Sequence, residues 1–273
     1  MLRMATAKDL PALVELRCAR YGGSRADAAG WLQNVAGLDH TLLVQAGGGP
    51  VQAMLAAVPV RYMHHRGVWF CGAAAADGVP LQTLLPRLLG SCLRAFAKSG
   101  AAFAVAAPQD AKQAKAMETL GFHNLLPTRV LTMPVRPNLL AQAEFDSLTV
   151  RQWMERRARS QPGQIALPEA AMNEVMTQLY RRGLTVVSSR RGYGLYLTRD
   201  GEMQFLELQA DNDAAADALL QAAREKTGTQ HARVLLAENQ TLYQGAGRRH
   251  SCGMIAFLAE PFPVTDVYFR MLL

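Results

Sequence analysis

The stretch Val68-Trp69-Phe70-Cys71-Gly72-Ala73-Ala74-Ala75-Ala76-Asp77-Gly78-Val79-Pro80-Leu81 combines an apolar strand, a turn and the start of a helix. The strand is predicted to run to Ala76, and leucines recur at helical spacing from Leu81 to Lys98. Asp77 to Pro80 forms the turn, with Gly78 as its glycine. The first N–H groups of a helix lack partners within the helix and attract anions. This junction is therefore the first candidate for a phosphate-binding site.

The segments around this stretch predict an alternation of strands and helices in the first half of the chain. Thr6 is expected to cap the first helix, because its hydroxyl can accept from a free N–H group. Gly47-Gly48-Gly49-Pro50 is expected to turn a hairpin. The predicted strands are Leu2–Thr6, Thr41–Gln45, Val51–Tyr62, Phe103–Ala107 and Asn124–Val135, with further helices after Thr6, at Ala26–Val35 and before Leu120-Gly121-Phe122.

The second half repeats the order of elements found from Thr41 to Val135, except that the last helix is missing or shortened, which predicts an internal structural repeat. The prolines of Pro134-Val135-Arg136-Pro137-Asn138 predict the boundary, so we expect domains at 1–136 and 137–273. The predicted helices are Val150–Ser160, Pro168–Arg182 and Ala214–Lys226, and the strands are Leu184–Ser189, Gly194–Arg199, Met203–Gln209, His231–Ala237 and Cys252–Leu258. Each half is expected to be an α/β (α+β) module, with a mixed, mainly antiparallel sheet flanked by helices.

Composition indicates a globular chain, since 50% of the 273 residues are hydrophobic and 19% are charged. No apolar run is long enough to cross a bilayer, and the first residues lack the pattern of a signal peptide. The four cysteines lie far apart and form no CxxC pair, as expected of small buried residues in a reducing cytoplasm. We therefore expect a cytoplasmic protein without a membrane segment or a metal site.

The positive charge is confined to the first half. Residues 1–136 contain 14 Lys and Arg and 7 Asp and Glu, whereas residues 137–273 contain 15 of each class. An anionic ligand would be attracted to the first half, although a basic surface without a ligand is the alternative interpretation. The basic residues are scattered, with no aromatic-plus-basic strand of the kind that RNA-binding sheets use, so a nucleic acid partner is not expected.

The first half, from Leu2 to Val135, resembles the GNAT superfamily of acyl-CoA-dependent N-acyltransferases. The resemblance rests on Asp9-Leu10-Pro11-Ala12-Leu13, the glycine hairpin, the strand into Ala73–Ala76 and Leu120-Gly121-Phe122. The second half is similar to the degenerate repeat of two-module bacterial members, including the ending Tyr268-Phe269-Arg270-Met271-Leu272-Leu273. The resemblance implies transfer of an acetyl group from acetyl-CoA to a small amine.

The resemblance also implies where the donor binds. The pantetheine arm is expected along the backbone of Ala73, Ala74 and Ala75, and the pyrophosphate at the turn and the helix start. Gln109, just past the next strand, is expected to contact the pantetheine arm. The implied cofactor-binding residues are Ala73, Ala74, Ala75, Gly78, Leu81, Gln82, Thr83 and Gln109.

Two departures from the family pattern support a second hypothesis, a non-catalytic GNAT-fold protein that binds a ligand or a protein. The turn is shortened and lacks the family's arginine, and Asp77 adds a negative charge. Met117 stands where many relatives carry a tyrosine that protonates the leaving thiolate, and a thioether cannot donate a proton.

The second module is expected to be structural, because its equivalent turn, Gln209-Ala210-Asp211-Asn212-Asp213, has no glycine and two carboxylates that would repel a pyrophosphate. Two-module relatives imply one catalytic candidate, the carboxylate of Leu273 acting as the base. Arg156-Arg157-Ala158-Arg159 is predicted to form an exposed helix face opposite Trp153. Neither the amine acceptor nor the oligomeric state follows from the sequence.

Overall fold

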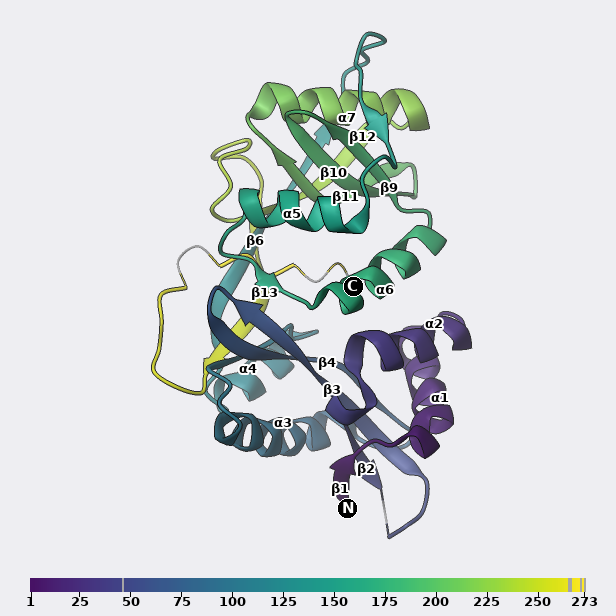
Figure 1. Cartoon of the computed structure of the whole chain (residues 1–273), viewed down its shortest axis with the longest axis vertical. Coiled ribbons are helices and arrows are strands. Elements are labelled where there is room, and N and C mark those ends of the chain that lie inside the picture. Colours follow the sequence, from purple (N-terminus) through teal and green to yellow (C-terminus); the bar gives the residue numbers. More distant parts are fainter. Residues whose placement is uncertain (46, 265–266, 271, 273) are drawn as a thin grey trace. The chain divides into compact units, whose positions relative to one another are not determined.

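The computed structural model describes residues 1–45, 47–264, 267–270 and 272, and its contacts define two compact units. The first unit consists of Met1–Leu126, Ile165–Val175 and Cys252–Thr265. The second consists of Pro127–Gln164, Met176–Ser251 and Asp266–Leu273. Each unit contains a mixed sheet with helices against it (Figure 1).

The sheet of the first unit has the strand order β1-β2-β3-β4-β5-β13, and β8 pairs with β3. Only one of its described pairings, β4 with β5, is parallel. The crossover between these two parallel strands is the helix α3. The strands are β1 (Leu2–Met4), β2 (Thr41–Gln45), β3 (Val51–Tyr62), β4 (His65–Ala75), β5 (Phe103–Ala106), β8 (Ile165–Ala166) and β13 (Arg248–Phe257).

Both faces of this sheet are covered, because side chains alternate between the faces along each strand. In β3, Leu55 and Ala57 join the buried cluster formed with α3 and α4, while Met54 and Ala56 point to the opposite face. Helices α1 and α2 lie on that opposite side (Figure 1). The helices of this unit are η1 (Ala7–Asp9), α1 (Leu10–Tyr21), α2 (Arg25–Gly30), the π-helix η2 (Trp31–Ala36), η3 (Leu38–His40), α3 (Leu81–Lys98) and α4 (Ala111–Glu118).

The sheet of the second unit has the strand order β6-β12-β11-β10-β9-β7. Here β11 and β12 are the parallel pair, joined by helix α7. Leu219, Leu220 and Ala223 of α7 pack against Met203 and Phe205 of β11. The elements are β6 (His123–Pro134), β7 (Glu144–Phe145), α5 (Val150–Ser160), β9 (Thr185–Ser189), β10 (Gly192–Arg199), β11 (Glu202–Ala210), α7 (Asp213–Thr227) and β12 (His231–Ala237). Helix α6 (Glu169–Arg181) and the strands β6 and β13 have residues in both units.

The two halves of the chain exchange their last strands. Strand β13 pairs with β5, with Phe257 opposite Phe103, and β6 pairs with β12, with Pro134 opposite His231. The division into units therefore differs from the single boundary expected after Arg136. The boundary differs because β6 and β13 each form backbone hydrogen bonds with a strand from the other half of the sequence.

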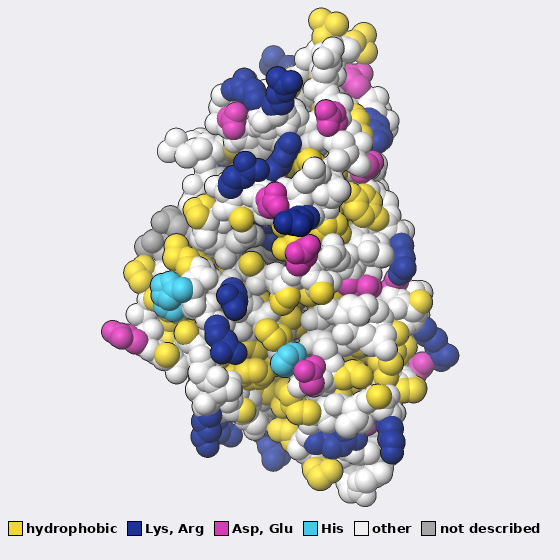
Figure 2. All heavy atoms as spheres, viewed as in Figure 1, with side chains coloured by type: hydrophobic (Ala, Val, Ile, Leu, Met, Phe, Trp, Pro, Cys, Tyr) yellow, Lys and Arg dark blue, Asp and Glu magenta, His cyan; other side chains and the backbone are white. Residues whose placement is uncertain are grey.

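Several predicted bounds agree with the structure to the residue, including Thr41–Gln45, Val51–Tyr62, Leu81–Lys98 and His231–Ala237. The prediction of an exposed Arg157 is wrong: its side chain is 2% exposed, because it pairs with the buried carboxylate of Glu207. On the face shown in Figure 2, Lys and Arg side chains lie in small separate groups. None of the described helices has the length and apolar content needed to cross a bilayer.

Candidate functional site

Strands β4 and β5 separate before β4 ends. Their parallel pairing runs from Gly67 opposite Phe103 to Phe70 opposite Ala106, which is the last residue of β5. Strand β4 continues to Ala75 and remains paired with β3 on its other edge. The last part of β4 therefore has one paired edge and one edge that an extended ligand can use for backbone hydrogen bonds.

A bulge lies at this point of separation. The register between β3 and β4 shifts between Met54 and Ala56, opposite Gly72, whose φ is +63°. A Cβ atom on Gly72 would lie 2.4 Å from Cη2 of the buried Trp31, so glycine is required for two independent reasons. Bulges bend a strand, and this one explains why the end of β4 leaves its neighbour.

After the turn that follows β4, two backbone donors at the start of α3 have no acceptor among the described residues. Gly78 has a φ of +76°, and the Val79 N–H donates to Ala76 O at 3.0 Å. The N–H groups of residues 83 and 84 both donate to the carbonyl of residue 80. Within the described part of the chain, the N–H groups of Leu81 and Gln82 have no backbone acceptor, and no side chain caps the helix. These groups form a natural contact for an anion.

A hollow of about 460 Å³ opens at the junction of the separated strands and the helix start. It contains five of the residues that the sequence analysis predicted for donor binding: Ala75, Leu81, Gln82, Thr83 and Gln109. Ala73 and Ala74 lie in the part of β4 that extends beyond its pairing with β5, and Gly78 lies in the turn, although none of the three lines the hollow. The structure thus brings five of the eight predicted residues together around one hollow.

Arg20, in the last turn of α1, is a lining residue that sequence reasoning missed. Its Nη2 donates to Oε1 of Gln109, which lies 89 residues away in the sequence. A lone arginine at a helix end has no sequence signal that distinguishes it from an ordinary surface residue. Only the packing of α1 beside the end of β4 reveals its position.

The Tyr21 hydroxyl contacts the same part of β4 from α1. The hydroxyl donates to Ala73 O at 3.0 Å. The guanidinium carbon of Arg17 lies 5.1 Å from the ring centroid of Tyr21 and 3.6 Å from that of Trp31. Burial raises the pKa of Tyr21 above its ordinary value, so its hydroxyl is protonated at neutral pH.

Burial likewise holds the pKa of the nearby Cys71 thiol far above the ordinary range. Cys71 is therefore a poor nucleophile here.

Two other predicted features have different outcomes. Met117 lies in α4, is 5% exposed and packs among apolar residues, so it fills the core. Leu273, the predicted base, lies outside the described residues. Among the described side chains, no group of three or more His, Cys, Asp and Glu residues is placed to hold a metal ion.

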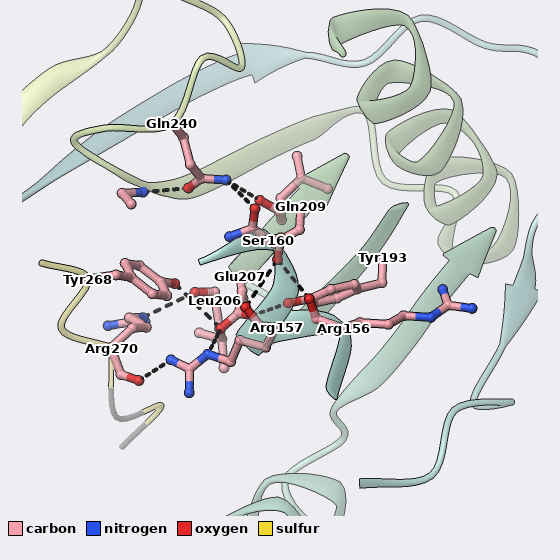
Figure 3. Close-up of polar contacts among 12 residues, drawn as sticks. Arg156, Arg157, Ser160, Tyr193, Leu206, Glu207, Gln209, Gln240, Tyr268 and Arg270 are labelled. Carbon is pink, nitrogen blue, oxygen red and sulfur yellow. Dashed lines mark hydrogen bonds and ion pairs between the residues drawn. The ribbon is translucent and has the colours of Figure 1, made fainter. Parts of the chain in front are cut away.

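The corresponding strand pair of the second unit is closed by a side chain. Beyond its last paired residues, Phe205 and Val234, the gap between β11 and β12 contains Gln240. Its Nε2 donates to Leu208 O at 2.8 Å, and its Oε1 accepts from the Ala237 N–H at 2.5 Å (Figure 3). Gln240 lies three residues past β12, just as Gln109 lies three residues past β5. The Gln240 side chain bridges β11 and β12, whereas the Gln109 side chain contacts Arg20.

Comparisons with solved structures identify the fold. The match with a GCN5-related N-acetyltransferase from Kribbella flavida covers 94% of this chain and 72% of the Kribbella chain, with a TM-score of 0.70 and 16% sequence identity. One from Anabaena variabilis matches the same shares with a TM-score of 0.72 and 12% identity. A tandem GNAT protein from the clavulanic acid biosynthesis pathway matches 96% of this chain and 100% of its own, with a TM-score of 0.58 and 11% identity.

The chain therefore has the fold of the GNAT N-acetyltransferases, as its sequence predicted. No protein-family model and no curated protein matches it. At these identities the likeness establishes the fold alone, and the function has to be argued from the site.

Proposed function

We propose that this protein is an acyl-CoA-dependent N-acyltransferase that transfers the acetyl group of acetyl-CoA to a small amine. One observation supports the proposal: the edge of β4 beyond β5 leads into a hollow where the N–H groups of Leu81 and Gln82 have no acceptor among the described residues. An extended ligand with amide groups followed by phosphates could contact first the edge of β4 and then the N–H groups at the start of α3. The pantetheine arm would pair with the backbone of Ala73 to Ala75, and the pyrophosphate would accept from the helix start.

The reaction in this proposal is direct transfer. The amine nitrogen attacks the thioester carbonyl carbon, the C–S bond breaks, the nitrogen loses a proton and the departing sulfur gains one. The high pKa of Cys71 argues against an acyl-cysteine intermediate. Met117 has no proton to give, so we assign the proton donor to Tyr21, whose hydroxyl touches Ala73. The carboxylate of Leu273 remains our proposal for the base.

The second unit is structural in this proposal. Gln240 occupies the gap that a pantetheine arm would need there. The turn before α7 places Asn212 as the helix cap, with its side chain accepting from the Ala215 N–H at 3.0 Å. The helix start is thereby satisfied internally and has less to offer a phosphate.

A non-catalytic protein that binds a ligand or a protein partner is the second candidate, and the buried Met117 specifically favours it. Two measurements separate the candidates. Thermal unfolding with acetyl-CoA at about a hundred times its dissociation constant should show a stabilisation of roughly 2.7 kcal/mol. Thiol release should then be measured over a panel of small amines. Thiol release supports the first candidate. Binding without thiol release, or the absence of binding at millimolar acetyl-CoA, contradicts the first candidate and supports the second.

A further inference from the structure

The turn beside the hollow supplies no positive charge for a phosphate ligand. The lining of the hollow includes two carboxylates, Asp77 and Asp110, and Asp110 already caps α4 by accepting from the Gln113 N–H at 2.7 Å. Among the described residues that line the hollow, Arg20 alone carries a positive charge. The turn itself, Asp77 to Pro80, contains no basic residue.

Arg20 reaches the hollow from a different element. It extends from the last turn of α1, and its guanidinium meets Gln109, which follows β5. Both side chains are exposed, so water competes with this hydrogen bond and a charged ligand can replace it. A guanidinium has five N–H donors in a planar fork, and a phosphate accepts two of them in parallel.

We propose that Arg20 binds the phosphates of the donor and supplies, from helix α1, the positive charge that the turn lacks. The proposal rests on the function proposed above. On donor binding, Arg20 exchanges its contact with Gln109 for a phosphate, while the N–H groups of Leu81 and Gln82 contact the same group from the other side. Asp77 is then opposed by a cation, which reduces its repulsion of the ligand.

The test compares two probes that differ in phosphate content. CoA carries phosphates and pantetheine carries none, so a phosphate contact affects only CoA. Dissociation constants for both should be measured by calorimetry with the wild type, Arg20→Ala, Arg20→Lys and the control Arg25→Ala. Arg25 is also exposed, pairs with Glu15 at 2.7 Å and is absent from the lining of the hollow.

Arg20→Ala is expected to weaken CoA binding about 10- to 100-fold, the size of a lost charge-assisted contact, and to leave pantetheine binding unchanged. Arg20→Lys should retain part of the affinity, because the charge remains but the fork is lost. The salt dependence of CoA binding should also decrease in Arg20→Ala.

Equal CoA affinities for Arg20→Ala and Arg25→Ala would overturn the role of Arg20 while leaving the proposed function intact. An equal loss for CoA and pantetheine would also overturn it, since the effect would then not depend on phosphate. If the wild type binds neither probe, the proposed function itself fails and this inference fails with it. Circular dichroism and melting temperature establish that each variant is folded.

Discussion

Arg157 Nε lies 3.0 Å from Glu207 Oε2, with the two side chains 2% and 0% exposed (Figure 3). Tyr193 donates its hydroxyl to the other carboxylate oxygen of Glu207 at 2.6 Å. Arg157 Nη2 also donates to Arg270 O at 2.5 Å. Burial and the charge of Glu207 raise the pKa of Tyr193 well above its ordinary value, so the phenol remains a donor. Helix α5, the sheet and the segment around Arg270 are thus joined by one buried network within the second unit.

Removal of one partner of this pair should strongly destabilise the protein. Arg157→Met leaves the carboxylate of Glu207 buried without its cation, and we expect a loss of about 3–5 kcal/mol. The double variant Arg157→Met with Glu207→Leu should lose less than the sum of the two single variants, because no charge is stranded. Urea unfolding measures all three. Additive losses would show that the two residues do not depend on each other.

Gln240 and Gln109 should differ sharply in their contribution to stability. Gln240→Ala leaves the buried Ala237 N–H and Leu208 carbonyl without a partner, with an expected cost of about 1–3 kcal/mol. Gln109→Ala removes only an exposed contact and should change stability by less than about 0.5 kcal/mol. The two variants serve as each other's control in thermal unfolding. Equal effects would refute the distinction between a bridged and an open strand pair.

The free N–H group at the start of α3 can be removed without removing the helix. Proline is tolerated in the first turn, so Leu81→Pro should keep the fold while it deletes one donor. Leu81→Ala loses the side chain and keeps the donor, which makes it the matched control. We expect Leu81→Pro to bind CoA about tenfold more weakly than Leu81→Ala, as for one lost charge-assisted hydrogen bond. Calorimetry with CoA measures the difference, and identical affinities would exclude this N–H group as a ligand contact.

Tyr21→Phe tests the proposed proton donor. The variant keeps the ring beside Arg17 and loses the hydroxyl that contacts Ala73. If Tyr21 protonates the leaving thiolate, kcat should fall about 10²- to 10⁴-fold while the dissociation constant for acetyl-CoA changes little. Steady-state thiol release and calorimetry separate these two quantities. Full turnover in Tyr21→Phe would rule out the assignment.

Asp9 should make the first unit sensitive to acid. Hydrogen bonds from Arg3, at 2.7 and 2.8 Å, and from Thr6 hold the pKa of Asp9 well below its ordinary value. The unfolded chain takes up a proton near pH 4, whereas the folded chain does not, so the stabilisation is present above that pH and decreases as the pH falls below it.

Asp9→Asn lacks this titration. Its unfolding free energy should be lower than that of the wild type at pH 7, and the difference should shrink between about pH 5 and pH 2.5. Urea titrations at several pH values provide the measurement. A difference in unfolding free energy between the two proteins that stays constant over this pH range would contradict the role of Asp9.

Local pattern in the sequence predicted most of the elements and five of the residues that line the hollow beside α3. The leucine spacing of Leu81–Lys98 predicted that helix to the residue, and the turn Gly47-Gly48-Gly49-Pro50 predicted a hairpin whose second strand is Val51–Tyr62. Gly78 and Pro80 marked the turn between β4 and α3, which is where the free N–H groups lie. These features depend on residues close together in the chain, where periodicity and turn chemistry act directly.

Tertiary structure alone decided the contacts between distant residues. Arg20 meets Gln109 across 89 positions, and Arg157 is buried only because Glu207 lies on a neighbouring strand. The exchange of β6 and β13 likewise depends on which strand offers free backbone groups once the sheets form. No local pattern specifies such pairings, because the residues around an arginine in the sequence do not show whether its side chain contacts water or a carboxylate. Its environment is set by the chain that folds against it.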